Sequence, residues 1–247
     1  MADAANNKKK PKPKVTAKTA KSASPRASTS VPKSAPPFVA NPDGTHCVQC
    51  VLQMALAHFG AEPVPSLLAL ARQTHKHPGG GTWFSSACLY LHDIGFELEI
   101  ISAMDIEAFS VDAQSYLDRH AGDDATFYRE NFDLQAAAQA ARRLVRLPGI
   151  TRQQKVPTVK NIRDLLARGY LVWIYVNEFA LEGREGLYPH AILAYDVTKG
   201  KGAGKIIAHN PGVESYPAQE LSDRILLRAM RSPQADSAML IGMKLPN

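Results

Sequence analysis

The stretch THCVQCVLQMALAHFG, residues 45–60, gives the clearest structural signal in the sequence. Its large apolar side chains recur at the spacing of one face of an α-helix, and a glycine follows as a helix stop. The residues on this face are Val51, Leu52, Ala55, Leu56 and Phe59. We therefore expect a helix that begins near Thr45 or His46 and ends at Gly60.

Cys47 falls in the first turn of this predicted helix. Backbone N–H groups in a first turn lack helical partners, and the helix dipole adds partial positive charge there. Both effects favour a thiolate over a thiol, and the thiolate is the nucleophilic form of cysteine. Cys47 is therefore a candidate nucleophile, and an inert core side chain is the alternative interpretation.

The remainder of the sequence predicts an α+β fold. Further helices are expected at residues 65–74, 82–93, 105–120, 133–146, 158–168 and 218–230, and strands at 96–101, 170–176, 191–197, 205–209 and 238–244. Most of the helices precede most of the strands, which is the order of an α+β domain. Residues 105–156 are expected to form a helical insert.

Two polar residues stand at the ends of predicted strands. His190 opens the strand at 191–197, and Asn210 closes the strand at 205–209. If these strands are neighbours, the imidazole and the amide can meet, and with Cys47 they would supply a nucleophile, a general base and an orienting group. The alternatives are a hydrogen-bonded structural histidine and an ordinary turn at Asn210-Pro211-Gly212.

Positive charge is concentrated at the start of the chain. The net charge of the 247 residues is +6, but residues 1–37 hold nine Lys and Arg against Asp3 alone, so the remainder is slightly acidic. The first 37 residues also lack aromatic side chains, and we expect a disordered basic tail followed by one domain at residues 38–247. Any contact with an anionic surface or with nucleic acid would belong to the tail and not to the domain, and a solubilising extension is the alternative interpretation of the tail.

Other sequence features concern location. No apolar run approaches the roughly 20 residues that span a bilayer, so no transmembrane segment is predicted. The basic N-terminus is not followed by an apolar segment, which argues against a Sec signal. Three cysteines, an odd number in a chain of this length, argue against a disulfide scaffold, so a reducing, cytoplasmic compartment is expected, with export by another route left open. The sequence gives no prediction of the oligomeric state.

These residues resemble the papain-like cysteine peptidases, and within them the bacteriocin-processing, double-glycine leader peptidase-like group. The resemblance consists of short islands between residues 38 and 217: Cys47 with Met54, Leu56, Phe59 and Gly60; Gly81-Thr82-Trp83 with Gly95-Phe96; Pro189-His190-Ala191-Ile192; and His209-Asn210-Pro211-Gly212. The separation of Cys47 from His190 lies within the roughly 130–150 residues of papain-like enzymes, and that of Cys47 from Asn210 slightly exceeds it.

The resemblance implies a papain-like fold, in which the cysteine helix and other N-terminal helices pack on a C-terminal antiparallel sheet. It implies that Cys47, His190 and Asn210 form a triad that hydrolyses a peptide or protein through a thioester. The family usually has an oxyanion-hole Gln about six residues before the cysteine, and here Asn41, one methylene shorter, takes that position. An inert binding module tethered by its basic tail, and an acyltransferase with the same triad, remain open.

The other cysteines allow further interpretations. Cys47 and Cys50 form a C-x-x-C pair, which allows a redox site, and His75 with His77 could add zinc ligands if their loop folded back. A redox site would follow a hydrophobic strand, whereas residues 41–44 predict a turn. We therefore assign Cys50 and Cys88 to packing and predict no metal and no cofactor.

Overall fold

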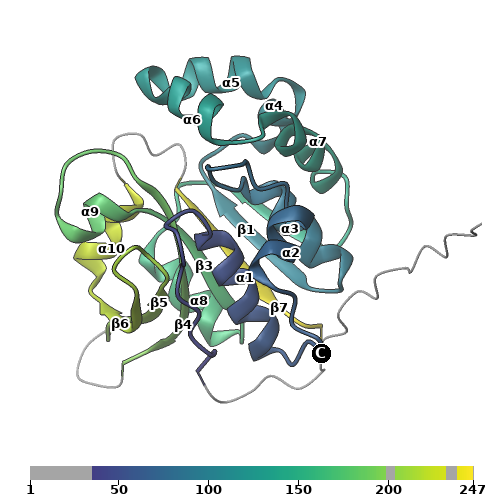
Figure 1. Ribbon diagram of the computed structural model, residues 1–247. Helices are drawn as coiled ribbons and strands as arrows, with labels where there is room; N and C mark the ends of the chain where they lie inside the picture. The colour runs from purple at the N-terminus through teal and green to yellow at the C-terminus, as the bar shows by residue number, and fades with distance from the viewer. Residues whose placement is uncertain (1–34, 199–203, 232–237, 247) are drawn as a thin grey trace, which may run out of the picture.

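The computed structural model describes residues 35–198, 204–231 and 238–246, and it has an α+β fold (Figure 1). Helices dominate the N-terminal half, and most strands follow them. The predicted disordered tail, residues 1–37, lies outside the described residues except for its last three positions. Pro36 is attached to the domain, because its carbonyl oxygen lies 2.8 Å from Nε2 of His209.

A seven-stranded sheet forms the centre of the molecule, with strand order β2-β1-β7-β3-β4-β5-β6. Only β1 and β2 are parallel, and the other neighbours are antiparallel. The strands are β1 (Glu97–Ser102), β2 (Ile150–Gln154), β3 (Leu171–Asn177), β4 (Pro189–Val197), β5 (Ile206–Asn210), β6 (Tyr216–Leu221) and β7 (Met239–Lys244). The predicted neighbourhood of the two strands that carry His190 and Asn210 is present, because β4 pairs with β5.

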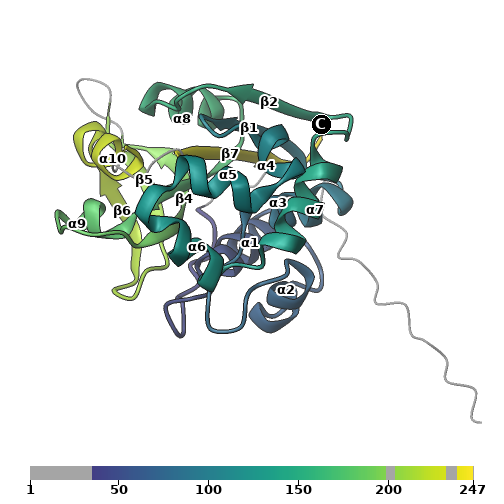
Figure 2. The same cartoon turned by 90° about the horizontal axis from the view of Figure 1, so that it is seen from above.

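Three helices from the N-terminal part cover one face of the sheet: α1 (Cys47–His58), α2 (Leu67–Gln73) and α3 (Phe84–Asp93). Figure 2 shows α1 and α2 on one side of the sheet and α8 on the other. The apolar face of α1 packs on alternate sheet residues such as Trp173 and Leu193, and its side chains Leu52, Met54 and Leu56 are fully buried. The periodicity that predicted this helix is therefore the periodicity of its core contacts.

The opposite face of the sheet is covered by α8 (Val159–Ala167) and α10 (Asp223–Met230), and the short α9 (Glu178–Glu182) packs on α10. Here the intervening strand residues, such as Ile174 and Ile192, form a second core cluster. Successive side chains of β3 and β4 point alternately into the two cores. Both faces of these strands are therefore buried, which explains why their sequences are continuous apolar runs.

Four helices after β1 pack beside α3, and three of them share its core: α4 (Ile106–Val111), α5 (Ala113–His120), α6 (Ala125–Asn131) and α7 (Leu134–Leu144), with the 3-10 turn η1 (Gly122–Asp124) before α6 (Figure 1). Aspartates cap three of them, since Asp105, Asp112 and Asp133 each accept a backbone N–H three residues on, at 2.9–3.0 Å. Trp83 joins the cluster to the domain by stacking on Phe109, with ring centroids 4.9 Å apart.

Several predicted boundaries differ from the structure. The helix expected at residues 218–230 starts only at Asp223, because residues 216–221 pair with β5 and Ser222 caps α10. The helix expected at 105–120 is divided at Asp112, which caps α5. The helix expected at 82–93 starts at Phe84, and the hydroxyl oxygen of Thr82, before the helix, accepts a hydrogen bond from the side chain of Gln49. Strands β2 and β6 and helices α6 and α9 had no counterpart in the prediction.

Within the described part of the chain, every helix is too short or too polar to cross a lipid bilayer.

Candidate active site

Cys47 is the first residue of α1 and is half-buried. The turn before it is ordered by Asp43, whose Oδ1 accepts hydrogen bonds from the Thr45 backbone and hydroxyl at 2.9 and 3.0 Å and lies 2.8 Å from Nδ1 of His46. Burial alone would raise the pKa of Asp43, but these hydrogen bonds lower it to about 2. Cys47 therefore follows an ordered turn and stands at the N-terminus of a buried helix.

Asn41 lies next to this turn. Its Oδ1 accepts a hydrogen bond from the His46 backbone N–H at 3.1 Å. Its Nδ2 is buried and has no hydrogen-bond partner among the described residues. Buried amide donors normally have an acceptor, so Asn41 carries an unused donor in the segment that precedes Cys47.

His190 and Asn210 contact each other directly. The second residue of β4 and the last residue of β5 meet across the strand pair, with His190 Nε2 and Asn210 Oδ1 2.7 Å apart. His190 is 1% and Asn210 2% exposed, so water does not compete for this bond. The contact that the sequence predicted for these two side chains is therefore formed.

The hydrogen bonds of Asn210 fix which nitrogen of His190 carries a proton. Asn210 Oδ1 also accepts the Gly212 backbone N–H at 2.9 Å, and its Nδ2 donates to Gln219 at 3.3 Å. Because Oδ1 is the acceptor, Nε2 of His190 must donate, which leaves Nδ1 of the neutral ring as the proton acceptor. Nδ1 is buried and has no hydrogen-bond partner within the described ranges, Cys47 included.

A tyrosine links the segment of Cys47 to the segment of His190. The hydroxyl of Tyr188, two residues before His190, donates to the carbonyl oxygen of Gly44 at 3.1 Å. Gly44 has φ +78°, and a Cβ there would lie 3.2 Å from this hydroxyl, so the close approach depends on glycine. Helix α1 also packs on β4. The N-terminus of α1 is thus attached directly to the start of β4.

Glu178 is a member of the site that the sequence reasoning missed. It directly follows β3, it is 4% exposed, and its Oε2 lies 4.0 Å from Nδ1 of His190. Burial, followed by the nearby Glu182, raises the pKa of Glu178 to about 7. No sequence motif marks this residue, because its proximity to His190 arises from the path of the chain after β3.

The other cysteines lie away from this arrangement. Cys50 and Cys88 are fully buried in α1 and α3. Burial raises the pKa of Cys50 to about 12 and that of Cys88 further still. The zinc site considered from the sequence is not formed, since no three His, Cys, Asp or Glu side chains among the residues in view are arranged to hold a metal ion.

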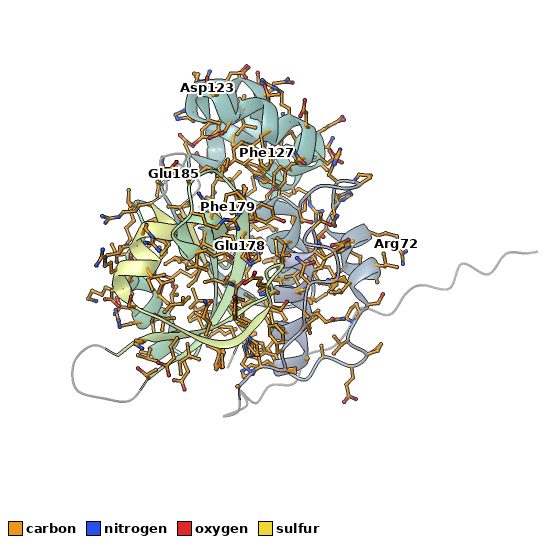
Figure 3. All side chains as sticks on the ribbon, turned by 60° about the vertical axis from the view of Figure 1, so that its left-hand side comes forward. Arg72, Asp123, Phe127, Glu178, Phe179 and Glu185 are labelled. Atoms are coloured by element: carbon orange, nitrogen blue, oxygen red, sulfur yellow. The ribbon has the colours of Figure 1, made fainter. Side chains whose placement is uncertain are left out.

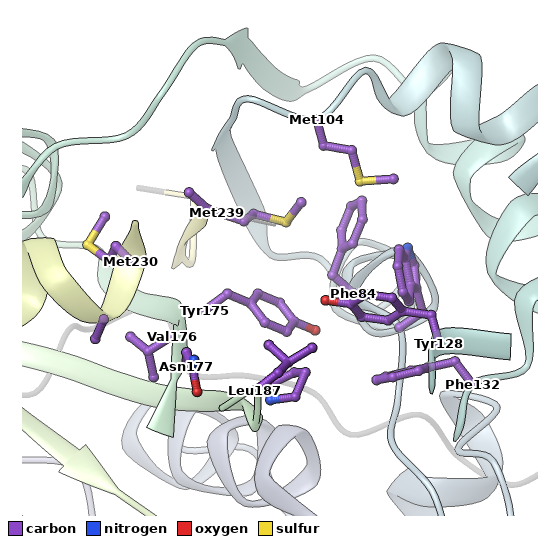
Figure 4. A pocket seen from close by; sticks show the side chains of 14 residues that line it. Phe84, Met104, Tyr128, Phe132, Tyr175, Val176, Asn177, Leu187, Met230 and Met239 are labelled. Atoms are coloured by element: carbon purple, nitrogen blue, oxygen red, sulfur yellow. The ribbon is translucent and has the colours of Figure 1, made fainter. Parts of the chain in front are cut away.

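An apolar pocket opens beside the ends of β3 and β4 (Figure 4). Tyr175 and Asn177 of β3 and Pro189 of β4 line it, next to Glu178 and His190 in the chain. Burial, followed by Cys47, raises the pKa of Tyr175 well above its usual value. The other lining residues are Trp83, Phe84, Met104, Tyr128, Phe132, Val176, Leu187, Ala229, Met230, Ala238 and Met239.

No model of a known protein family matches this chain, and no curated protein sequence matches it with significance.

Proposed function

We propose that this protein is a papain-like thiol hydrolase, most simply a cysteine peptidase, that acts through Cys47, His190 and Asn210. One observation carries the proposal: Asn210 holds the buried His190 ring through Nε2, so that the unpaired nitrogen is Nδ1. A second supports it, since the Tyr188–Gly44 hydrogen bond attaches the start of β4 to the turn before Cys47. Catalytic histidines are oriented in this way by a third group.

The proposed reaction begins when the Cys47 thiol gives its proton to Nδ1 of His190. The thiolate attacks the carbonyl carbon of the substrate, and a carbon–sulfur bond forms. Nδ2 of Asn41 and the backbone N–H of Cys47 would donate hydrogen bonds to the resulting oxyanion. When the bond to the leaving amine breaks, the amine takes the proton from Nδ1 and a thioester remains.

In the second half of the reaction, water replaces the amine. His190 accepts one proton from this water as its oxygen attacks the thioester carbon. The carbon–sulfur bond then breaks, the sulfur takes the proton from Nδ1, and a carboxylic acid leaves. The same thioester could pass to another amine, so acyl transfer by the same triad is a variant of this proposal.

The pocket beside β3 and β4 suggests the kind of substrate. Its walls are aromatic, methionine and aliphatic side chains, and they adjoin His190 through Pro189. Such a surface accepts a bulky apolar side chain and offers few partners to a charged one. We therefore propose a peptide or protein substrate with an aromatic or large aliphatic residue close to the bond that is cleaved.

A second candidate is a catalytically inert binding module of the same fold. The observation in its favour is that the Cys47 thiol makes no hydrogen bond with Nδ1 of His190 in this structure. Catalytic hydrogen bonds are often long in free enzymes, so this observation alone does not exclude activity.

The test is to trap the thioester. The full chain is mixed with a p-nitrophenyl ester of an N-acyl-phenylalanine, and the adduct is located by mass spectrometry. We expect acylation of Cys47, none in Cys47→Ala, and slower acylation in His190→Ala. A Val213→Ala variant, which changes an exposed residue of the loop after Asn210, serves as the matched control. Absence of an adduct on Cys47 would favour the inert module.

A further inference from the structure

The free nitrogen of His190 faces a buried carboxylate. Oε2 of Glu178 lies 4.0 Å from Nδ1, whereas Asn210 binds Nε2. Val176 pairs with His190 across β3 and β4, and Glu178 is two residues further along the same chain direction. A buried carboxyl group therefore lies close to Nδ1, while an amide oxygen binds Nε2.

The carboxyl group of Glu178 lies against the loop that follows β5. Its backbone N–H donates to the carbonyl oxygen of Tyr188 at 2.9 Å, which fixes the start of α9 against the entrance of β4. A Cβ on Gly212 would collide with Oε1 of Glu178, so the carboxyl group lies directly on the glycine backbone. Gly212 is also the residue whose N–H is bound by Asn210. Figure 3 shows Glu178 in the interior of the molecule.

We infer that Glu178 is a positioning residue that acts through His190, because its charge stabilises the protonated form of the ring. A carboxylate at this distance attracts a proton on Nδ1, whereas it repels the lone pair of the neutral ring. The two groups therefore favour states in which they hold one proton between them. Glu178 thus sets how readily His190 accepts and keeps the proton of the nucleophile.

Neighbouring groups shift the pKa of Glu178 both upwards and downwards. Burial is the main cause that raises its pKa to about 7; Glu182 and Glu214 add to the rise and Arg184 opposes it. From the β4 side it faces His190 and the neighbouring Tyr188, whose pKa is raised by burial and then by Glu178.

Helix α10 packs on α9 and carries Arg228 close to the segment of Glu178. Arg228 binds the carbonyl oxygens of Ala180 and Leu181 and leaves the Glu178 carboxylate without a strong ion pair from that side. Glu178 consequently changes charge near neutral pH, where the state of Nδ1 matters for the proposed reaction.

The first test does not depend on the proposed activity. Full-length Cys47→Ala protein, which lacks the thiol, is labelled with ¹⁵N at histidine, and the His190 ring is followed between pH 5 and 9 by NMR, with and without Glu178→Gln. We expect the ratio of protonated to neutral ring to fall about tenfold or more in Glu178→Gln at the same pH. The control variant Glu185→Gln removes an exposed charge from the loop after α9, and we expect little change in this ratio.

A purely structural role for Glu178 would leave this ratio unchanged, because glutamine preserves the shape of the side chain. An unchanged ratio in folded Glu178→Gln would overturn the inference. If that variant does not fold, Glu178→Asp, which keeps the charge but withdraws it by one methylene, should give a smaller fall in the same direction. A ratio in Glu178→Asp equal to that of the parent protein would likewise overturn it.

The second test rests on the proposed function. In protein that retains Cys47, the alkaline limb of the pH profile for acylation should move to lower pH in Glu178→Gln, since the protonated ring is less stable. Failure of the proposed function would abolish acylation and leave the NMR result intact. Failure of this inference would leave both the acylation profile and the NMR titration unchanged by the substitution.

Discussion

Replacing Asn210 with alanine should destabilise the fold in a way that the structure allows us to estimate. The Asn210 side chain is 2% exposed and its Oδ1 is the acceptor for two buried donors, Nε2 of His190 at 2.7 Å and the Gly212 N–H at 2.9 Å. Alanine removes this acceptor and leaves both donors in place. The variant therefore loses stability because two buried donors lack an acceptor, and not only because a contact is removed.

Leaving one buried donor without its acceptor costs about 1–3 kcal/mol, so two donors give about 2–6 kcal/mol. A water molecule that enters the vacated space would satisfy one donor and bring the cost towards the lower end of this range. A loss of this size is a large fraction of the total stability of an ordinary domain.

The free energy of unfolding is measured by urea titration at pH 7.5 for the full chain and for Asn210→Ala. Gln219→Ala is the matched control, because Gln219 accepts only the 3.3 Å bond from the same side chain and is half-buried. We expect its loss to be below about 1 kcal/mol. Equal losses in the two variants, or a loss below about 1 kcal/mol in Asn210→Ala, would refute the hydrogen-bond assignment at His190.

Three further predictions follow from other parts of the structure. Burial lowers the pKa of His209, so its contribution to stability is present above pH ~6.5 and is lost as the pH falls. The free energy of unfolding from urea titration should therefore differ less between pH 7 and pH 5 in His209→Gln than in the parent protein. Equal differences in the two proteins would contradict this. Leu187→Arg places a charge in the pocket wall. It should lower kcat/KM for a substrate with an aromatic residue at the cleavage site by about 10–100-fold relative to kcat/KM for the same substrate with glycine there, which is the equivalent of one buried apolar side chain. An unchanged ratio of these two kcat/KM values would contradict a role of the pocket in substrate binding. Asp133→Ala should cost about 1 kcal/mol by uncapping α7, whereas the exposed Asp123→Ala should change stability by less than about 0.5 kcal/mol.

The sequence predicted well those elements in which the spacing of apolar residues matches the face that is buried. α1 has a continuous apolar face, which the structure buries against the sheet, and Cys47 stands at its first position as expected. The neighbourhood of His190 and Asn210 was predicted from the ends of two strands close in sequence. Antiparallel strands joined by a short connection commonly pair, so this contact needed little tertiary information.

The elements that were missed depend on contacts that no local pattern records. Residues 218–221 carry a helix-compatible sequence, yet they pair with β5, and Ala218 adopts φ +52°. The helix expected to begin at Thr82 begins at Phe84, and Gln49 of α1 donates a hydrogen bond to the Thr82 hydroxyl across the core.

Glu178 illustrates the same limit within the candidate site. Glutamate is usually a surface residue, and the sequence places it in an unremarkable segment after a strand. Its burial against Gly212 and its approach to His190 result from the turn of the chain into α9. Such a residue becomes visible only when the side chains of β3, β4 and the loop after β5 are seen together.

The central claim is that Cys47 is a nucleophile activated by His190, and the rate of its alkylation tests this most directly. The folded full chain and His190→Ala are treated with iodoacetamide at pH 6.5, and the modified residue is mapped by peptide mass spectrometry over time. We expect that Cys47 is modified first, that the buried Cys50 and Cys88 stay unmodified, and that His190→Ala slows modification of Cys47 at least about tenfold. Modification of Cys50 or Cys88 before Cys47, or an equal rate at Cys47 in both proteins, would contradict it.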